Sequence, residues 1–296
     1  MFFQIFKTLT KLTSKNNFVN ESYISAGGTE EILDQTGRIV SSPKKLKTTI
    51  GQDDIVFSNF ENSVAHSFWR SQELSIFQRA KQDFKKPILD FGCGDGAFSA
   101  CIFEGINFGV DIDEKALGIA TLYDLYDELI TFESLIRKMP NASIETVFSC
   151  SVLEHTTHLS DCISQISRIL KPGGRFYFTV PNTNFTDQMV SLVDKNFAEN
   201  MNKRMFHRNL LDEKQWTNLL VSNGFRIVRI QSFQPISFTK KYFSLSLLGQ
   251  RALGAIPGVS KLFLSLMMSR LMSEVNESIS GIGDKGANYY VIASKI

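Results

Sequence analysis

Short apolar segments alternate with stretches of helical periodicity through the middle of the chain. The apolar segments read as buried strands, because they are brief and bounded by turn residues. The predicted strands cover 88–90, 107–113, 129–132, 144–150, 175–180, 225–230 and 287–293. Helical spacing of apolar residues covers 63–84, 97–104, 160–170 and 213–222, and a further helix begins at 115. Strands and helices that alternate in this way predict an α/β fold with a parallel sheet covered on both faces.

The first predicted strand ends in an acid followed by a glycine turn. The sequence over 89–96 is LDFGCGDG, with Asp90 at the end of the strand. Three glycines within five residues let the backbone turn sharply and lie directly against a ligand. The backbone N–H groups that open the next helix point toward the same place. This stretch therefore predicts a nucleotide-type pocket.

A second acid follows at the end of the second predicted strand. Asp111 lies 19 positions beyond Gly92, where folds of this type hold the ribose diol of a nucleotide. Asp113 and Glu114 then suit the N-terminus of the next helix, and Asp113 is expected to cap it.

The same residues also satisfy the dinucleotide fingerprint G-x-G-x-x-G/A. Gly92, Gly94 and Ala97 match its spacing, and Asp111 matches its downstream acid. Because this fingerprint alone discriminates weakly, an NAD(P)-binding oxidoreductase stays open at this point.

Composition narrows the range of partners. The chain has 296 residues and a formal net charge of +2, which gives no whole-molecule basis for binding nucleic acid. The four cysteines show no C-x-x-C spacing. This pattern predicts a reduced, cytoplasmic compartment rather than a zinc site or a disulfide framework, and no metal site is predicted.

Four short motifs occur in order along the chain. They are LDFGCGDG at 89–96, GVDI at 109–112, VLEH at 152–155 and LKPGG at 170–174. In these motifs the chain resembles the class I S-adenosylmethionine-dependent methyltransferases, over roughly residues 63–232 and the final strand. The resemblance implies a three-layer Rossmann-like fold with a seven-stranded, mostly parallel sheet and an antiparallel last strand. It also implies an enzyme with S-adenosyl-L-methionine as cofactor, and Asp90, Gly96 and the last two motifs favour this cofactor over NAD(P).

The resemblance assigns roles residue by residue. The implied cofactor-binding residues are Asp90, Gly92, Cys93, Gly94, Asp111, Ile112, Ser149 and Cys150. Asp90, Gly92 and Gly94 would line the methionine portion of the cofactor. Asp111 would hold the ribose hydroxyls, and Ile112 would lie against the adenine. Ser149 and Cys150 would contact the methionine end from the fourth strand.

One contact of the family has no clear counterpart. Many relatives carry an Asp-Ala pair after the third strand that reads the adenine amine. Here that position falls near Leu135, with Glu133 as a weak substitute, so the adenine-amine contact stays open.

Two histidines are candidates for catalysis. Methyl transfer requires mainly that the acceptor be held near attack distance, and a general base matters only for a hydroxyl or an acidic carbon. His155 lies just beyond the fourth strand, and His207 lies in a region that often closes the acceptor site in relatives. A structural hydrogen-bonding role is the alternative for each.

The class of methyl acceptor is inferred mainly by excluding other classes. The sequence lacks the Asn/Asp-Pro-Pro-Tyr/Phe motif of amino-methylating nucleic-acid enzymes and the Pro-Cys pair of cytosine-C5 enzymes. Without a basic stripe, nucleic acid is not an expected partner. A small molecule, a sugar or a lipid-linked intermediate is left as acceptor. The alternative is a catalytically silent subunit that binds S-adenosylmethionine.

A predicted helix before the first strand places three notable residues together. Either Trp69, Arg70 and Glu73 cap the pocket, with Arg70 meeting a ligand carboxylate, or Trp69 packs beside a solvated ion pair. The second interpretation is the favoured one.

The chain divides into an N-terminal extension at 1–62, a methyltransferase core at 63–232, a helical insertion at 233–285 and a last core strand at 286–296. Residues 2–12 are amphipathic, which suits either a helix packed on its own domain or a basic anchor on a membrane. Residues 259–275 carry a wide apolar face, which suits a lid or homodimer helix, a greasy acceptor pocket or a membrane contact. No apolar run reaches the about 18 residues of a spanning helix. We therefore expect a cytoplasmic protein, with peripheral contact at the inner membrane face as the alternative.

Overall fold

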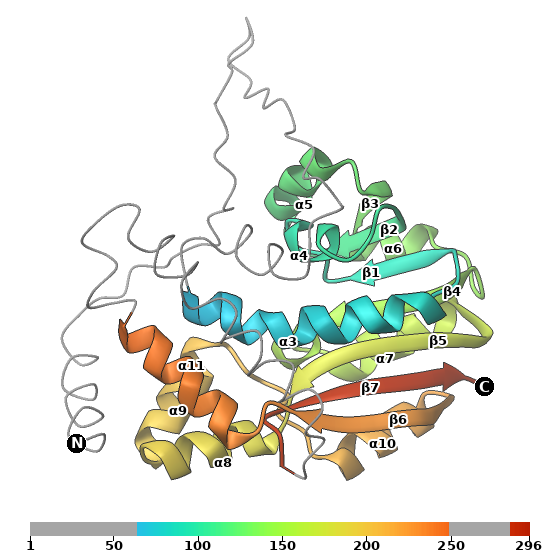
Figure 1. Cartoon of the computed structure of the whole chain (residues 1–296). Helices are drawn as coiled ribbons and strands as arrows, with labels where there is room; N and C mark the ends of the chain where they lie inside the picture. Colours follow the sequence, from blue (N-terminus) through green and yellow to red (C-terminus); the bar gives the residue numbers. More distant parts are fainter. Residues whose placement is uncertain (1–63, 249–284) are drawn as a thin grey trace, which may run out of the picture.

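A single seven-stranded sheet forms the centre of the protein (Figure 1). The computed structural model describes residues 64–248 and 285–296. The strands lie in the order β3-β2-β1-β4-β5-β7-β6. Their bounds are β1 Ile88–Phe91, β2 Ile106–Asp111, β3 Tyr126–Thr131, β4 Ile144–Cys150, β5 Leu170–Pro181, β6 Phe225–Phe233 and β7 Asn288–Lys295.

The direction of the strands confirms the predicted fold class. Strands β1 to β5 pair in parallel, whereas β7 runs antiparallel to both β5 and β6. The predicted N-terminal extension lies outside the described residues, and so does the predicted insertion beyond residue 248, except for residue 285. The division of the chain into four parts therefore stays a prediction.

Helices cover both faces of the sheet. The α-helices are α3 Val64–Ala80, α4 Ala97–Ala100, α5 Glu114–Ala120, α6 Phe132–Lys138, α7 Leu159–Ile169, α8 Thr183–Leu192, α9 Lys195–Arg204, α10 Glu213–Ser222 and α11 Ile236–Leu248. Short 3-10 turns are η1 Lys81–Asp83, η2 Thr121–Tyr123 and η3 Leu153–His155. The sequence pattern did not predict α6, α8 or α9. It also predicted too long a helix after the glycine turn, because α4 ends at Ala100.

The starts of two helices test the sequence predictions. The Asp113 side chain accepts hydrogen bonds from the backbone N–H groups of Lys115 and Ala116, so it caps α5 as predicted. The helix predicted over 160–170 is α7, which begins one residue earlier, at Leu159.

Consecutive residues of the central strands enter two different apolar clusters. Leu89, Val147 and Phe176 pack with α6, α7 and α10 on one face, where Trp216 is fully buried. Ile88 and Phe148 pack with α3 on the other face. The sheet is thus buried on both faces, as parallel sheets generally are.

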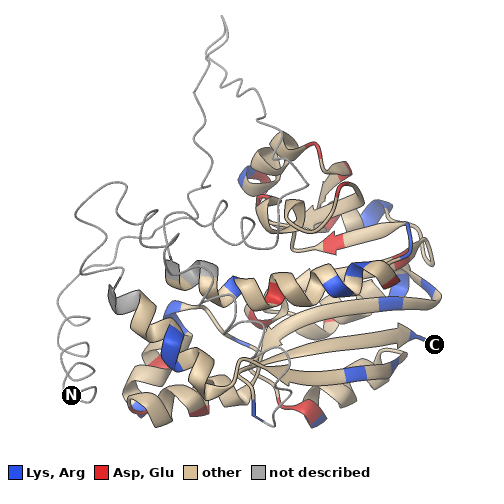
Figure 2. Ribbon diagram, viewed as in Figure 1, with Lys and Arg blue, Asp and Glu red and all other residues tan. Residues whose placement is uncertain are grey.

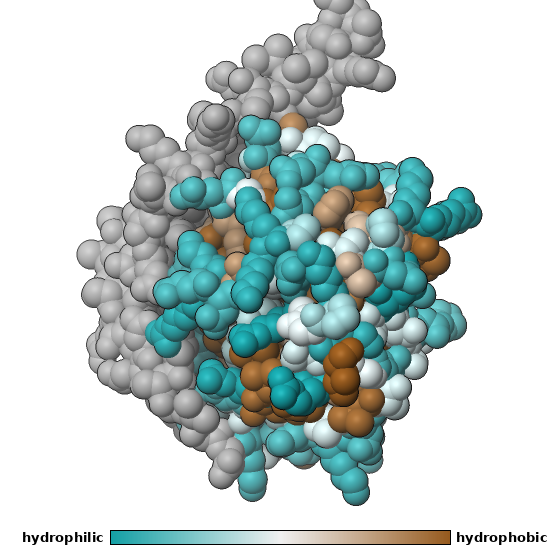
Figure 3. All heavy atoms as spheres, turned by 90° about the vertical axis from the view of Figure 1, so that its right-hand side faces the viewer, coloured by the Kyte–Doolittle hydropathy of each residue, from teal (hydrophilic) through white to brown (hydrophobic). Residues whose placement is uncertain are grey.

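The surface is mixed in charge and in polarity. Figure 2 shows Lys and Arg interspersed with Asp and Glu over the described part of the chain. Figure 3 shows the end of the molecule where the chain terminates, which is mainly hydrophilic with small apolar patches. The carboxyl ends of β1, β2 and β4 lie at the opposite edge of the sheet (Figure 1).

Candidate functional site

The candidate site lies where the carboxyl ends of β1, β2 and β4 meet. β1 pairs in parallel with both neighbours, so the residues that follow these three strands come to one edge of the sheet. The motifs at 89–96, 109–112 and 152–155 are brought together there. The fourth motif, at 170–174, opens β5, which runs parallel to β4. It therefore lies at the opposite edge and has a structural role.

The three glycines of the turn have different structural roles. All three have positive φ angles, of 80°, 55° and 80° for Gly92, Gly94 and Gly96. A Cβ on Gly92 would lie 2.4 Å from Val152 Cγ2. A Cβ on Gly96 would lie 3.2 Å from the Tyr126 ring. A Cβ on Gly94 would meet nothing within 4 Å. The sequence predicted that the glycines let the backbone lie against a ligand. Of the three, only Gly94 faces open space, so only Gly94 leaves room for a ligand at its Cα.

Asp111 connects the end of β2 to the glycine turn. Its Oδ2 accepts a hydrogen bond from the Gly94 N–H at 2.8 Å, and its Oδ1 accepts one from the Asp113 N–H at 3.0 Å. Each carboxylate oxygen keeps a second lone pair. The neighbouring Ile112 side chain is 83% exposed, an apolar surface that a planar ring can cover. The ribose contact predicted for Asp111 and the adenine contact predicted for Ile112 stay predictions.

Asp90 is a buried carboxyl group at the end of β1. Its side chain accepts hydrogen bonds from Ser99 Oγ at 2.5 Å and from the Tyr126 hydroxyl at 2.7 Å. Burial raises the pKa of Asp90 to about 7, with a smaller increase from the Asp111 charge, while the two hydrogen bonds oppose the shift. Asp90 therefore titrates near neutral pH.

Three predicted cofactor residues direct their side chains into the core. The Ser149 side chain is fully buried, and its hydroxyl donates to the Phe91 carbonyl at 2.8 Å. Cys150 and Cys93 are also buried, and burial raises the pKa of both thiols. Any contact of Ser149 with a ligand would therefore come from its backbone, not from its hydroxyl.

A buried polar cluster lies behind the end of β4. Arg70 pairs with Glu73 at 2.6 Å. The other carboxylate oxygen of Glu73 accepts hydrogen bonds from the hydroxyls of Ser151 at 2.6 Å and Thr179 at 2.9 Å. The Arg70 guanidinium also lies over the Phe98 ring, 4.3 Å from its centroid. The predicted ion pair exists, but the prediction that it is solvated was wrong, because Glu73 is fully buried.

Trp69 has the packing role that the sequence favoured. Its ring contacts those of Phe185 at 5.9 Å and Tyr242 at 5.0 Å between centroids. These contacts join α3 to α8 and α11. The sequence did not predict this pairing, because nothing local in a sequence shows which helices pack together.

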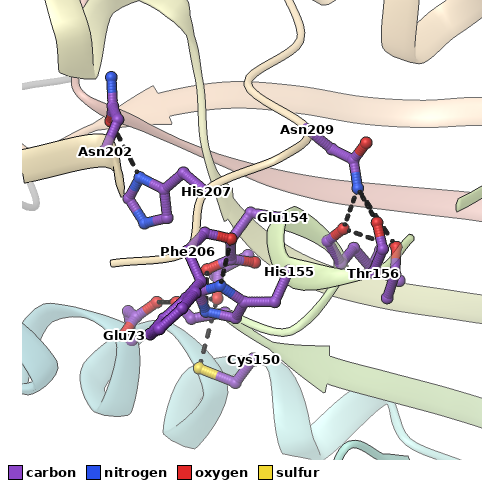
Figure 4. Close-up of polar contacts among 12 residues, drawn as sticks. Glu73, Cys150, Glu154, His155, Thr156, Asn202, Phe206, His207 and Asn209 are labelled. Carbon is purple, nitrogen blue, oxygen red and sulfur yellow. Dashed lines mark hydrogen bonds and ion pairs between the residues drawn. The ribbon is translucent and has the colours of Figure 1, made fainter. Parts of the chain in front are cut away.

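The two candidate histidines lie side by side (Figure 4). The rings of His155 and His207 are 5.6 Å apart between centroids, although the residues are 52 positions apart in sequence. His155 Nδ1 lies 3.4 Å from the Phe206 carbonyl oxygen. A carbonyl only accepts, so this contact places the proton on Nδ1 and leaves the lone pair on Nε2. His207 Nδ1 lies 3.2 Å from Asn202 Oδ1.

Both imidazoles are neutral at physiological pH. Burial, together with a smaller effect of the neighbouring His155, lowers the pKa of His207 to about 4. Burial also lowers the pKa of His155, against the effect of backbone hydrogen bonds. His155 is the more exposed of the two, so it is the better placed to meet a ligand.

Glu154 is a buried carboxyl group beside this pair. Its Oε1 lies 3.6 Å from His155 Nε2, and its Oε2 is buried without a hydrogen-bond partner. The pKa of Glu154 is raised to about 8, mainly by burial. A hydrogen bond from its own backbone N–H opposes the shift. The charge of Glu73 raises the pKa slightly, and the charge of Arg70 lowers it. Glu154 is therefore largely protonated at neutral pH.

Asn209 holds the loop that carries these residues, and the sequence analysis did not single it out. Its Nδ2 donates to the carbonyls of Leu153 at 2.8 Å and Thr156 at 2.7 Å (Figure 4). The backbone N–H groups of Arg208 and Asn209 donate to the Glu154 carbonyl at 2.7 and 3.1 Å. The segment after α9 is thus fastened directly onto η3, which explains why His207 reaches His155.

The comparison that decides the family is a match to a family model. The model of the methyltransferase domain matches residues 67–230, which is more than half of the chain. The chain belongs to this family. It is a class I S-adenosylmethionine-dependent methyltransferase, as the sequence predicted, and S-adenosyl-L-methionine is its cofactor.

Curated relatives match this methyltransferase over part of their length. A ubiquinone biosynthesis O-methyltransferase of Pseudomonas putida (strain GB-1) is 30% identical over 176 residues, which is 52% of this chain and 75% of that protein. One from Dechloromonas aromatica is 31% identical over 124 residues, which is 39% of this chain and 53% of that protein. The chain spans about half the length of the first relatives that it matches.

Solved structures share the fold of the methyltransferase. A Galdieria sulphuraria protein assigned as a sarcosine dimethylglycine methyltransferase has a TM-score of 0.50 at 17% identity, covering 77% of this chain and 85% of that one. A SAM-dependent methyltransferase from Archaeoglobus fulgidus has a TM-score of 0.48 at 18% identity, covering 76% and 94%. At these identities the likeness concerns the fold alone.

The described residues of the methyltransferase fit its cofactor at one end of the turn. Gly94 leaves open the space that a Cβ would fill, Asp90 offers a carboxyl group beside it, and Asp111 and Ile112 follow on the next strand. Glu133, the weak substitute for the adenine contact, instead pairs with Arg137 on an exposed helix surface.

The described part of the chain holds neither a candidate metal cluster nor a candidate membrane-spanning helix. Within it, no group of three or more His, Cys, Asp and Glu side chains is arranged to hold a metal ion. Over the same residues, no helix has the length and apolar character needed to span a bilayer.

Proposed function

We propose that this methyltransferase transfers a methyl group to a hydroxyl oxygen of a small-molecule or lipid-linked acceptor. The observation that carries the proposal is the pair of neutral imidazoles, His155 and His207, at the edge where the glycine turn also lies. A neutral imidazole can accept the proton that a hydroxyl loses on methylation. The relatives named O-methyltransferases support the same class of reaction.

The cofactor would be held along the ends of β1 and β2. We propose that Asp90, Gly92, Cys93 and Gly94 line its methionine portion, with the turn contributing mainly backbone. We further propose that Asp111 accepts hydrogen bonds from the ribose hydroxyls through its second lone pairs, and that Ile112 covers the adenine. The exposed face of Ile112 and the open space at Gly94 support this placement.

Ser149 and Cys150 are proposed to shape the methionine end rather than to bind it through their side chains. The Ser149 hydroxyl donates to the Phe91 carbonyl, and the Cys150 thiol lies 3.3 Å from the Thr179 hydroxyl, which donates its proton to Glu73. The first contact joins β4 to β1, and the second joins β4 to β5.

His155 is the proposed general base. The cofactor supplies an electrophilic methyl group. As the acceptor oxygen forms its bond to that methyl group, the hydroxyl proton would pass to His155 Nε2 and then to solvent. The carboxyl group of Glu154, whose Oε1 lies 3.6 Å from His155 Nε2, would help to orient the imidazole. His207 has too low a pKa to be an effective base, so we propose that it contacts the acceptor.

The test is methyl transfer from tritiated S-adenosylmethionine to matched pairs of phenols and anilines of the same skeleton. We expect labelled product from the phenols, and a loss of roughly a hundredfold or more in kcat with His155→Asn. The control is His158→Asn, whose exposed ring lies near the start of α7. Transfer to anilines alone, or unchanged turnover by His155→Asn, would refute O-methylation through this base.

A catalytically silent subunit is the other candidate function. It predicts that calorimetry detects S-adenosylmethionine binding while no acceptor class takes up label. The intact pair of histidines beside the cofactor residues favours the enzyme over this alternative.

Peripheral membrane contact and a homodimer are further proposals that rest on sequence alone. Their segments, 2–12 and 259–275, lie outside the described residues. Co-sedimentation with anionic liposomes, for the full chain and for a chain lacking residues 1–15, tests the membrane proposal. Equal recovery of both chains in the supernatant would contradict it.

A further inference from the structure

A tyrosine from β3 crosses over β2 to reach the carboxyl group at the end of β1. In the sheet, β2 lies between β3 and β1. The Tyr126 hydroxyl nevertheless donates to Asp90 Oδ2 at 2.7 Å. Neighbouring strands lie roughly 4.8 Å apart, so the ring must lie across the intervening strand.

Gly109 is the residue that makes this crossing feasible. It pairs with Asp90 in the register of β1 and β2. A Cβ at Gly109 would lie 2.8 Å from Tyr126 Cδ1 and 2.9 Å from Cε1. A glycine inside a strand often marks such a close approach. A Cβ there would also lie 2.6 Å from Leu129 Cδ2, so the Tyr126 ring and the Leu129 side chain together explain the glycine of the GVDI motif.

Tyr126 also contacts the glycine turn itself. Its Cε2 lies 3.2 Å from the position that a Cβ on Gly96 would take. Tyr126 and Ser99 both donate to Oδ2 of Asp90. Because both donors use the same oxygen, Oδ1 of Asp90 is left for a ligand.

We propose that Tyr126 is a positioning residue for the cofactor, which acts by fixing the Asp90 carboxyl group through the gap at Gly109. This inference rests on the proposed function, in which Asp90 lines the methionine portion of the cofactor. That portion carries an ammonium group, so the ionised form of Asp90 binds it better than the neutral acid does. Tyr126 favours the ionised form, because a hydrogen bond donated to a carboxylate stabilises its charge.

The proton balance follows from the groups around Asp90. The groups that face it are the hydroxyls of Ser99 and Tyr126 and the titratable side chains of Asp111 and Cys93. When the cofactor binds at a pH where Asp90 is protonated, Asp90 releases that proton to solvent. Loss of the Tyr126 hydroxyl makes this release harder, so tight binding shifts to higher pH.

The experiment measures binding of S-adenosylmethionine by calorimetry from pH 6 to pH 9, with steady-state KM and kcat on any acceptor found. The variant is Tyr126→Phe in the full chain, and the control is Tyr123→Phe. Tyr123 packs in the same apolar cluster. We expect Tyr126→Phe to weaken binding at pH 7 by roughly tenfold or more. We also expect its pH profile to move upward and KM for the cofactor to change more than kcat.

A double-mutant cycle with Asp90→Asn separates positioning from a general structural effect. If Tyr126 acts through Asp90, Tyr126→Phe weakens binding little further when Asp90 is already Asn. Equal losses in both backgrounds, or an unshifted pH profile for Tyr126→Phe, overturn the inference while leaving the proposed function intact. Failure of the unmodified chain to bind S-adenosylmethionine at any pH overturns the proposed cofactor site, and the inference falls with it.

Discussion

Alanine substitutions at two glycines of the same turn should affect different properties, folding stability at Gly92 and cofactor affinity at Gly94. Gly92 and Gly94 both have positive φ angles, which cost an alanine about 1–2 kcal/mol. At Gly92 the new Cβ would also collide with Val152 Cγ2 at 2.4 Å, and such overpacking costs about 1–3 kcal/mol more. Gly92→Ala should therefore destabilise the protein by about 2–5 kcal/mol. Gly94→Ala should cost only the backbone part.

The affinity for the cofactor should fall more in Gly94→Ala than in Gly92→Ala. The Cβ of Gly94→Ala would enter the open space that we assign to the cofactor. Overpacking of about 1–3 kcal/mol there corresponds to a loss of roughly tenfold to a hundredfold in affinity. Urea unfolding gives the stability of each variant, and calorimetry with S-adenosylhomocysteine gives its affinity.

The matched control is Gly105→Ala. A Cβ at Gly105 meets nothing within 4 Å, and the residue has no positive φ. It should leave affinity unchanged and stability equal or slightly higher. Wild-type affinity in Gly94→Ala would refute the cofactor placement. Stability of Gly92→Ala equal to that of Gly105→Ala would refute the packing argument.

Two further predictions concern the loop after β4. Burial raises the pKa of Glu154 to about 8 from 4.5, so the folded state keeps a proton that the unfolded state loses between these values. The free energy of unfolding should then fall as pH rises from about 4.5 to 8. Urea titrations should show a smaller decline for Glu154→Gln than for the wild type. An equal decline in the wild type and the variant would contradict the raised pKa. Asn209→Ala removes the donor to the Leu153 and Thr156 carbonyls and should cost about 2–3 kcal/mol. The control Asn200→Ala, at an exposed amide contact of 3.5 Å, should cost far less, and equal losses would refute the role of Asn209.

The local sequence was sufficient for the strands and for the glycine turn. β1, β4 and β5 are apolar and covered on both faces. Their residues form short apolar runs bounded by turn residues, so the presence of these strands was easy to predict. β3 was predicted too short, because it is an edge strand whose Asp127 and Glu128 are exposed. Helices α8 and α9 were not predicted. Their apolar faces pack against α3 and α11 and not against the sheet.

The sequence by itself predicted an α/β fold, a nucleotide-type pocket and the residues at the strand ends, because these depend on short-range patterns of glycine, acid and apolar residues. The resemblance of its four motifs to a known family added the cofactor. Only the tertiary structure decided which of these side chains face the open edge. Ser149 and Asp90 both follow apolar strand residues, yet Ser149 is consumed by a bond to Phe91, whereas Asp90 keeps one oxygen for a ligand. The crossing of Tyr126 over Gly109 depends on the order of strands in the sheet. No local pattern encodes that order, since it is set by how the whole chain buries its apolar surface.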